Sequence, residues 1–78
     1  MKEFMVCLHS VQEVQEFVGL ATTMGFPVLV DDGRHQVAGD SFMEMFCLDY
    51  SRPLTVICQC DDGQLETFRT AAKRYLAY

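Results

Sequence analysis

The sequence is poor in positive charge and contains no long apolar run. Six lysines and arginines stand against 11 aspartates and glutamates, so the formal net charge is -5. Nucleic acids and anionic membranes attract basic proteins. The charge balance therefore argues against both as the main partner and favours a basic protein surface. A helix that crosses a bilayer needs about 20 consecutive apolar residues, and the sequence has no such run.

Signals for secretion and for metal binding are also missing. The first ten residues, MKEFMVCLHS, lack the apolar core of a signal peptide. We therefore expect a cytoplasmic protein with reduced thiols. None of the four cysteines forms a CxxC pair, and only two histidines could add ligands. This spacing does not favour a metal site. We interpret Cys58 and Cys60 as small hydrophobes on one face of a strand, and we expect no cofactor.

Length and hydrophobicity are typical of one small folded domain. Half of the 78 residues are hydrophobic, which excludes a disordered chain. We expect a single domain over residues 1–78. A chain of this size buries roughly 60–65 % of its unfolded surface, so its stability should be modest.

Alternation and helix-start signals predict strand, helix, strand, strand, helix, strand, helix. The strands are expected at residues 2–8, 27–31, 34–38 and 54–60. Long helices are expected from Ser10 to Met24 and from Asp61 to about Leu76, and Gly25 should end the first in a left-handed conformation. Asp32-Gly33 predicts a two-residue hairpin turn.

A short helix is expected after Ser41. Ser41 with Glu44 predicts a capping box, as does Ser10 with Glu13. The residues after Ser41 are apolar nearly all round the helix, so they cannot all face one core. Such a patch is typical of a docking surface, and a tightly buried short helix is the alternative. The predicted docking residues are Phe42, Met43, Met45, Phe46 and Leu48.

These elements fit an α+β fold, with a four-stranded antiparallel sheet and the helices on one face. The ferredoxin-like fold has a similar element order and is the alternative; the order of the strands in the sheet separates the two. The outward face of the predicted sheet would also be apolar, which favours a homodimer or another protein partner. The residues expected there are Met5, Cys7, Leu29 and Ile57.

In these segments the chain resembles HPr, the small phosphocarrier of the bacterial sugar phosphotransferase system. Residues 17–30, FVGLATTMGFPVLV, resemble the family's first helix and second strand. Residues 31–48, DDGRHQVAGDSFMEMFCL, resemble its hairpin, its serine-initiated short helix and the apolar residues that follow. The resemblance covers nearly the whole chain. It implies an HPr-like open-faced sandwich of β-α-β-β-α-β-α order.

The chain departs from this family at the phosphorylated histidine. In HPr this histidine starts the first helix and is followed by any residue, arginine and proline. Alignment of the first helix brings Ser10 to the histidine position, Gln12 to the arginine and Glu13 to the proline. Glu13 adds negative charge where phosphate would bind. The resemblance therefore implies a regulatory or adaptor protein without catalytic activity, linked to the phosphotransferase system.

Two alternatives stay open, namely an active phosphocarrier phosphorylated on His9 and an unrelated ferredoxin-like binding module. Ser41 matches the serine that a dedicated kinase phosphorylates in many relatives, whose product binds a transcriptional regulator. A regulatory phosphorylation of Ser41 is thus one interpretation, and a plain helix cap is the other. The expected partners are phosphotransferase components or a transcriptional regulator. No nucleophile–base pair suggests an independent enzyme.

Overall fold

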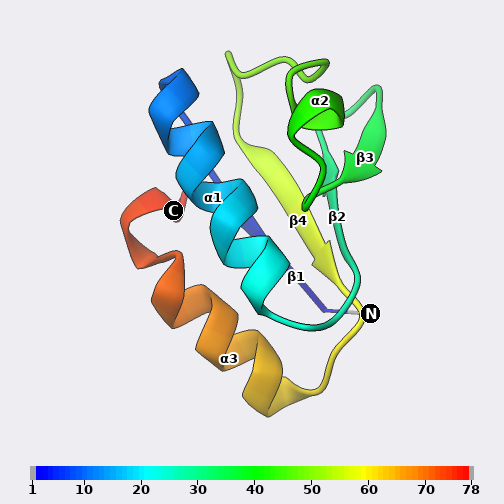
Figure 1. The fold of residues 1–78 in the computed structure, drawn as a ribbon, viewed down its shortest axis with the longest axis vertical. Coiled ribbons are helices and arrows are strands. Elements are labelled where there is room, and N and C mark those ends of the chain that lie inside the picture. Colours follow the sequence, from blue (N-terminus) through cyan, green and yellow to red (C-terminus); the bar gives the residue numbers. More distant parts are fainter. Residues whose placement is uncertain (1, 78) are drawn as a thin grey trace.

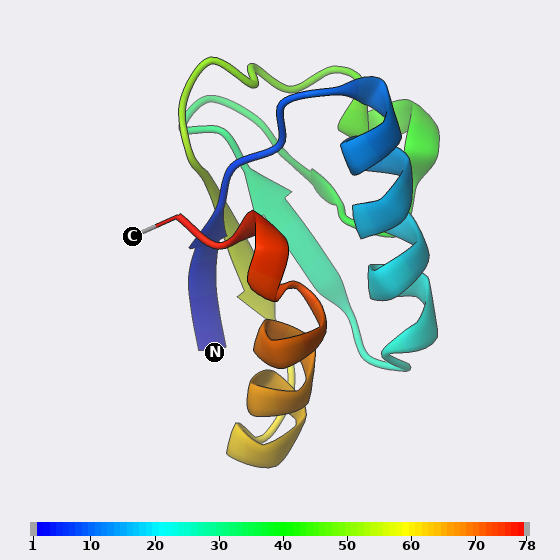
Figure 2. The same ribbon diagram turned by 90° about the vertical axis from the view of Figure 1, so that its left-hand side faces the viewer.

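The computed structural model describes residues 2–77, which form one sheet with two long helices on one of its faces (Figures 1 and 2). The strands are β1 (Lys2–Val6), β2 (Val28–Asp31), β3 (Gln36–Ala38) and β4 (Leu54–Cys58). The helices are α1 (Val11–Thr23), α2 (Phe42–Met45) and α3 (Asp62–Ala71), followed by the 3-10 turn η1 (Lys73–Tyr75). The predicted order of strands and helices is confirmed.

The sheet has the strand order β1-β4-β2-β3, and each neighbouring pair is antiparallel. The central strand β4 pairs on both sides, so that Val56 lies opposite Phe4 in β1 and opposite Val30 in β2. β1 is an edge strand. A ferredoxin-like sheet needs parallel neighbouring strands, so the structure shows the antiparallel open sheet that was predicted and not that alternative.

Aromatic side chains join the helices to the sheet in the core. Phe68 of α3 is fully buried, and its ring centroid lies 5.3 Å from that of Phe4 and 5.7 Å from that of Phe17. Phe26 follows α1, and its ring centroid lies 6.0 Å from that of Phe68. Such pairs add about 0.5–1.5 kcal/mol each beyond the burial of area. The core therefore holds α1 and α3 on a single face of the sheet.

The start of α1 differs from the predicted capping box. The Glu13 amide donates to Ser10 Oγ at 3.1 Å, so the serine cap is confirmed. The Glu13 carboxylate, however, accepts from the amide of His9 at 2.8 Å and not from that of Ser10. The full reciprocal box forms at the start of α3. At the other end of α1, Gly25 has a φ of 80°, as its predicted left-handed conformation requires.

The predicted two-residue hairpin turn is wrong. Asp31 pairs with Gln36, so residues 32–35 form a four-residue loop in which the Asp32 amide donates to the His35 carbonyl at 3.1 Å. The Asp32 carboxylate accepts from the amides that follow it, which stabilises this longer loop. Arg34 and His35 therefore belong to the turn and not to a strand.

The last helix is shorter than predicted, because the chain turns back to the edge of the sheet. α3 ends at Ala71. The Cys7 amide then donates to the Tyr75 carbonyl at 2.7 Å, and the Ala77 amide donates to the Met5 carbonyl at 2.9 Å. Residues 75–77 thus cover the C-terminal part of the edge strand β1, whose backbone groups would otherwise lack partners.

Candidate functional site

The start of α1 and the end of α2 meet at one end of the molecule, where they enclose a hollow of about 270 Å³. Figures 1 and 2 both place α2 beside the first turns of α1 at that end. The hollow joins residues about 40 positions apart in the sequence. Its lining consists of Leu8, His9, Ser10, Val11, Val14, Phe46 and Tyr50.

Exposed apolar residues lie at the edge of this hollow and along the one-turn helix beside it. Met43 is 84 % exposed, Val11 59 % and Phe46 50 %. The half-buried ring of Phe42 lies 5.2 Å from that of Phe46, which holds the two rings together. We call Val11, Phe42, Met43 and Phe46 the apolar patch. It contains three of the four large, exposed hydrophobic residues in residues 2–77, the fourth being Met5.

The patch differs from the predicted docking set at three residues. Met45 and Leu48 are buried in the core, with 0 % and 7 % exposure, so a partner cannot reach them. The reason is that α2 is a single turn, in which Met43 and Met45 point to opposite sides. Val11 lies at helical spacing from the buried Val14 and Val18, but the first turn of α1 lies beside the hollow, where Val11 is exposed.

Ser41 caps α2, as the sequence predicts. The Glu44 amide donates to Ser41 Oγ at 3.4 Å, and the Ser41 amide donates to the Ala38 carbonyl at 3.2 Å. The Glu44 carboxylate accepts from the Ala38 amide at 3.3 Å and not from that of Ser41, so this predicted capping box is also incomplete. Ser41 is half-buried. Its hydroxyl oxygen therefore has a structural role at the start of α2.

The chain segments that carry the patch are acidic. The carboxylate of Glu13 is held at the start of α1 by the His9 amide, at the positive end of the helix dipole. The side chain of His9 itself is exposed. Residues 9–14 and 40–50 contain four acidic residues and no lysine or arginine. The acidic residues are Glu13, Asp40, Glu44 and Asp49.

A half-buried tyrosine, Tyr50, fixes the loop that follows α2. The Tyr50 hydroxyl donates to the Met45 carbonyl at the end of α2. Burial, with smaller contributions from Asp32 and Cys47, raises the pKa of Tyr50 to about 12. The hydroxyl therefore stays protonated at neutral pH and remains a hydrogen-bond donor, which holds one wall of the hollow in place.

Asp32 joins the hairpin to the same loop. Its side chain is 2 % exposed and accepts from the amides of Arg34 at 2.8 Å, His35 at 2.7 Å and Asp49 at 2.9 Å. Hydrogen bonds from His35, Asp49 and Arg34 hold the pKa of this carboxyl well below its usual range. The sequence identifies Asp32 only as a turn residue, because its bond to Asp49 spans 17 positions.

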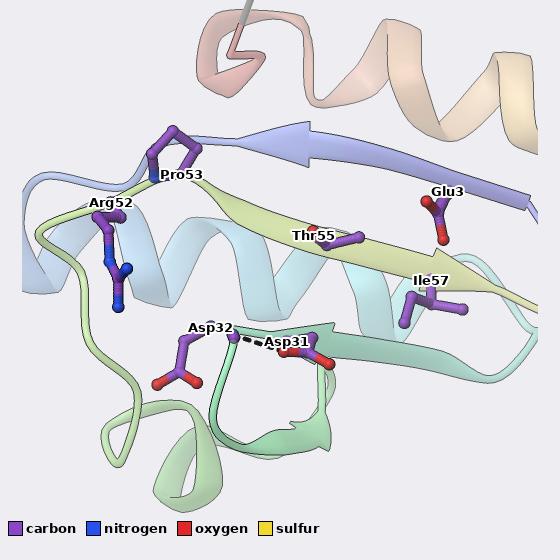
Figure 3. A pocket seen from close by; sticks show the side chains of 8 residues that line it. Glu3, Asp31, Asp32, Arg52, Pro53, Thr55 and Ile57 are labelled. Carbon is purple, nitrogen blue, oxygen red and sulfur yellow. Dashed lines mark hydrogen bonds between the residues drawn. The ribbon is translucent and has the colours of Figure 1, made fainter.

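The open face of the sheet carries a second hollow, of about 430 Å³ (Figure 3). As predicted, Met5, Leu29 and Ile57 lie on this face, because the strands alternate and Leu29 pairs with Ile57. Met5 is 43 % exposed and the other two are half-buried. Cys7 lies beyond the end of β1, where it is half-buried. The carboxylates of Glu3 on β1 and Asp31 on β2 line the hollow, and Figure 3 shows them on either side of β4, which carries Thr55 and Ile57.

The cysteines lie apart from the apolar patch except for Cys47, which is exposed directly after Phe46. Cys58 is fully buried, and burial raises the pKa of its thiol to about 12, so it behaves as the predicted small hydrophobe. Residues 2–77 contain no group of three or more histidine, cysteine or acidic side chains placed to hold a metal ion. None of the helices in that range is long and apolar enough to cross a membrane.

Comparison of the chain with models of protein families and with curated proteins finds no match in either set. The likeness to HPr therefore depends on the residues and segments quoted above.

Proposed function

We propose that this chain is an HPr-like protein without phosphocarrier activity, which acts as a regulatory or adaptor protein of the phosphotransferase system. One observation carries the proposal. The exposed side chains of Val11 and Phe46 line the hollow at the start of α1, where the carboxylate of Glu13 accepts from the His9 amide. The wholly antiparallel sheet, with its long helices on one face, agrees with the resemblance.

The surroundings of His9 do not suit phosphoryl transfer. A phosphoryl group on its imidazole would lie in the region that contains Glu13 and no lysine or arginine in residues 9–14. Stabilisation of transferring phosphate requires donors or positive charge aimed at it. The amide of His9, which could donate to a phosphate, already donates to Glu13 at 2.8 Å.

The apolar patch suits docking of a protein. Met43 has most of its surface exposed to water and Phe46 has half. Transfer of apolar area out of water contributes about 25 cal/mol per Å² to the free energy of binding. Exposed patches of this kind mark interaction sites on soluble proteins. The proposed partners are phosphotransferase components or a transcriptional regulator.

A phosphoryl-transfer assay tests the proposal. The protein is incubated with phosphoenolpyruvate and the general phosphotransferase enzyme, with a functional HPr as the positive control, and the intact mass is measured. We expect the control to gain a phosphoryl group and this protein to gain none. An acid-labile phosphoryl group that is lost in His9→Ala would show instead that the protein is a phosphocarrier.

A further inference from the structure

We infer that the apolar patch binds an amphipathic helix whose apolar stripe is flanked by lysine or arginine. The inference rests on the proposed docking function and specifies the chemistry of the partner. It follows from the shape of the hollow, from the backbone groups near it and from the charges that surround it.

The hollow is the size of a side-chain pocket. Its volume of about 270 Å³ lies below the roughly 300–1,000 Å³ of typical small-molecule sites. Leu8, Val14 and Phe46 supply apolar walls. A large apolar side chain can therefore fill the hollow while its neighbours one turn away contact Met43 and Phe42, as in helix-in-groove recognition.

A partner strand has little backbone to pair with at this end of the molecule. The amide of Ala38, on the edge strand β3, donates to the Glu44 carboxylate, and its carbonyl accepts from the Ser41 amide. On the opposite edge of the sheet, residues 75–77 cover the C-terminal part of β1. Recognition therefore uses side chains, which a helix presents along one face.

The charge around the patch selects a basic partner. Glu13 and Glu44 are held by backbone amides, so their charges have defined positions, and Asp40 is exposed. Oδ2 of Asp49 lies 3.9 Å from Nη2 of Arg52, and this ion pair partly offsets the negative charge of Asp49. Opposite charges around an apolar centre raise the association rate and reject like-charged partners. A second copy of this chain would bring the same acidic residues together and is disfavoured.

Alkylation of Cys47 gives a direct measurement of binding. Cys47 is exposed beside Phe46, whereas Cys60 is half-buried beyond the far end of β4. The probes are three synthetic helices with one leucine stripe, flanked by lysine, by glutamine or by glutamate. Iodoacetamide labelling of the two thiols is followed in one mass spectrum. We expect the lysine-flanked helix to slow labelling of Cys47 about fivefold or more at saturation, to leave Cys60 unchanged, and to bind most tightly of the three.

A matched pair of charge reversals separates local from overall charge. Asp40→Lys and Glu66→Lys change the net charge equally, but Glu66 lies on α3, beside Arg69. From the energies typical of exposed ion pairs, we expect Asp40→Lys to weaken binding of the lysine-flanked helix about threefold or more. Glu66→Lys should change the affinity by less than about twofold at physiological salt, because solvent screens distant charges.

A third variant, Phe46→Ser, distinguishes failure of the inference from failure of docking. We expect it to abolish protection of Cys47 by all three helices. Equal protection by the three helices, or equal effects of the two charge reversals, would overturn the inferred basic partner and leave docking through the patch in place if Phe46→Ser still abolishes binding. Protection that survives Phe46→Ser, or no protection by any helix, would overturn the inference. Phosphocarrier activity in the transfer assay would overturn the proposed function independently.

Discussion

Two surfaces of this molecule are rich in apolar residues in the sequence, and the apolar patch exposes more of them than the open face of the sheet, where Met5 is 43 % exposed. In the apolar patch, Met43, Val11 and Phe46 are each at least half exposed. On the open face of the sheet, Leu29 and Ile57 lie on paired strands and are half-buried. Neighbouring strands lie only about 4.8 Å apart, so side chains on one face cover each other. A one-turn helix at the end of a domain has no such neighbours.

The two surfaces also differ in how charge is arranged. Within residues 2–77, no carboxylate lines the hollow beside the patch, and the acidic residues lie in the same chain segments as the patch residues. On the sheet face, Glu3 and Asp31 lie in the hollow itself, beside Ile57 (Figure 3). Burial of that face would therefore remove charged groups from water, which is costly without partners. The comparison favours the patch as the docking surface.

The largest expected effect separates the two sides of α2. Met45→Ala removes a fully buried side chain and should lower the free energy of unfolding by about 2–5 kcal/mol. Met43→Ala removes an exposed one and should change it by less than about 0.5 kcal/mol. Urea unfolding of both variants measures the difference. Similar losses in the two would show that α2 does not pack as described.

Acid should weaken the link between the hairpin and the loop after α2. The pKa of Asp32 is lower in the folded chain than its usual value of 3.8. The ionised carboxylate therefore stabilises the fold above about pH 4, and this stabilisation is lost as the pH falls below that value toward the folded pKa. In the wild type, the free energy of unfolding should therefore fall as the pH is lowered, and we call this decrease the acid limb. We expect Asp32→Asn to make the acid limb less steep, as measured by urea unfolding between pH 2 and 6.

Asp40→Asn serves as the control for Asp32, because Asp40 is an exposed carboxyl near the same end of the molecule. It should leave the acid limb unchanged. An acid limb that is equally steep in wild type and Asp32→Asn would contradict the assigned role of Asp32.

The cap of α2 should have a smaller effect. Ser41→Ala removes the acceptor of the Glu44 amide and should cost about 1 kcal/mol of stability. Ser41→Asp keeps an acceptor at this position, so it should lose less in the same urea experiment. Ser41→Ala as stable as wild type would rule out the cap as the structural role of this residue.

The smallest expected effect is on self-association. A homodimer through the sheet face would bring Glu3 and Asp31 of two copies together, so we expect a monomer by light scattering at low ionic strength. Met5→Lys should then leave the measured mass unchanged. A dimer at low salt that Met5→Lys dissociates would instead assign docking to the sheet face and reverse the comparison.

Local features of the chain follow from the sequence because each depends on residues a few positions apart. Ser10 and Ser41 cap their helices as predicted, and Asp61 caps α3 in the same way, since a side-chain oxygen reaches the amide three residues on. Gly25 ends α1 because glycine accepts positive φ. The alternation of buried residues with exposed ones in β1, and with half-buried ones in β4, matches the predicted strands.

Features that depend on distant residues required the tertiary structure. The sequence predicts caps at both serines but does not show that the carboxylates of Glu13 and Glu44 bond to amides outside the helices. Nor does it show that Met45 faces the core while Val11 faces the hollow. Helical spacing defines an apolar stripe, but it does not show which part of that stripe is packed against other elements of the fold.

The sequence by itself determined the elements of this protein, their order, their helix starts and the absence of a histidine-arginine pair at the start of the first helix. Only the tertiary structure decided the strand order β1-β4-β2-β3, the return of residues 75–77 to β1 and the meeting of Val11 with Phe46 in one hollow. The physical reason is range. Caps and alternation are set by contacts within a few residues, whereas a surface is made by whichever distant segments the packed core brings together.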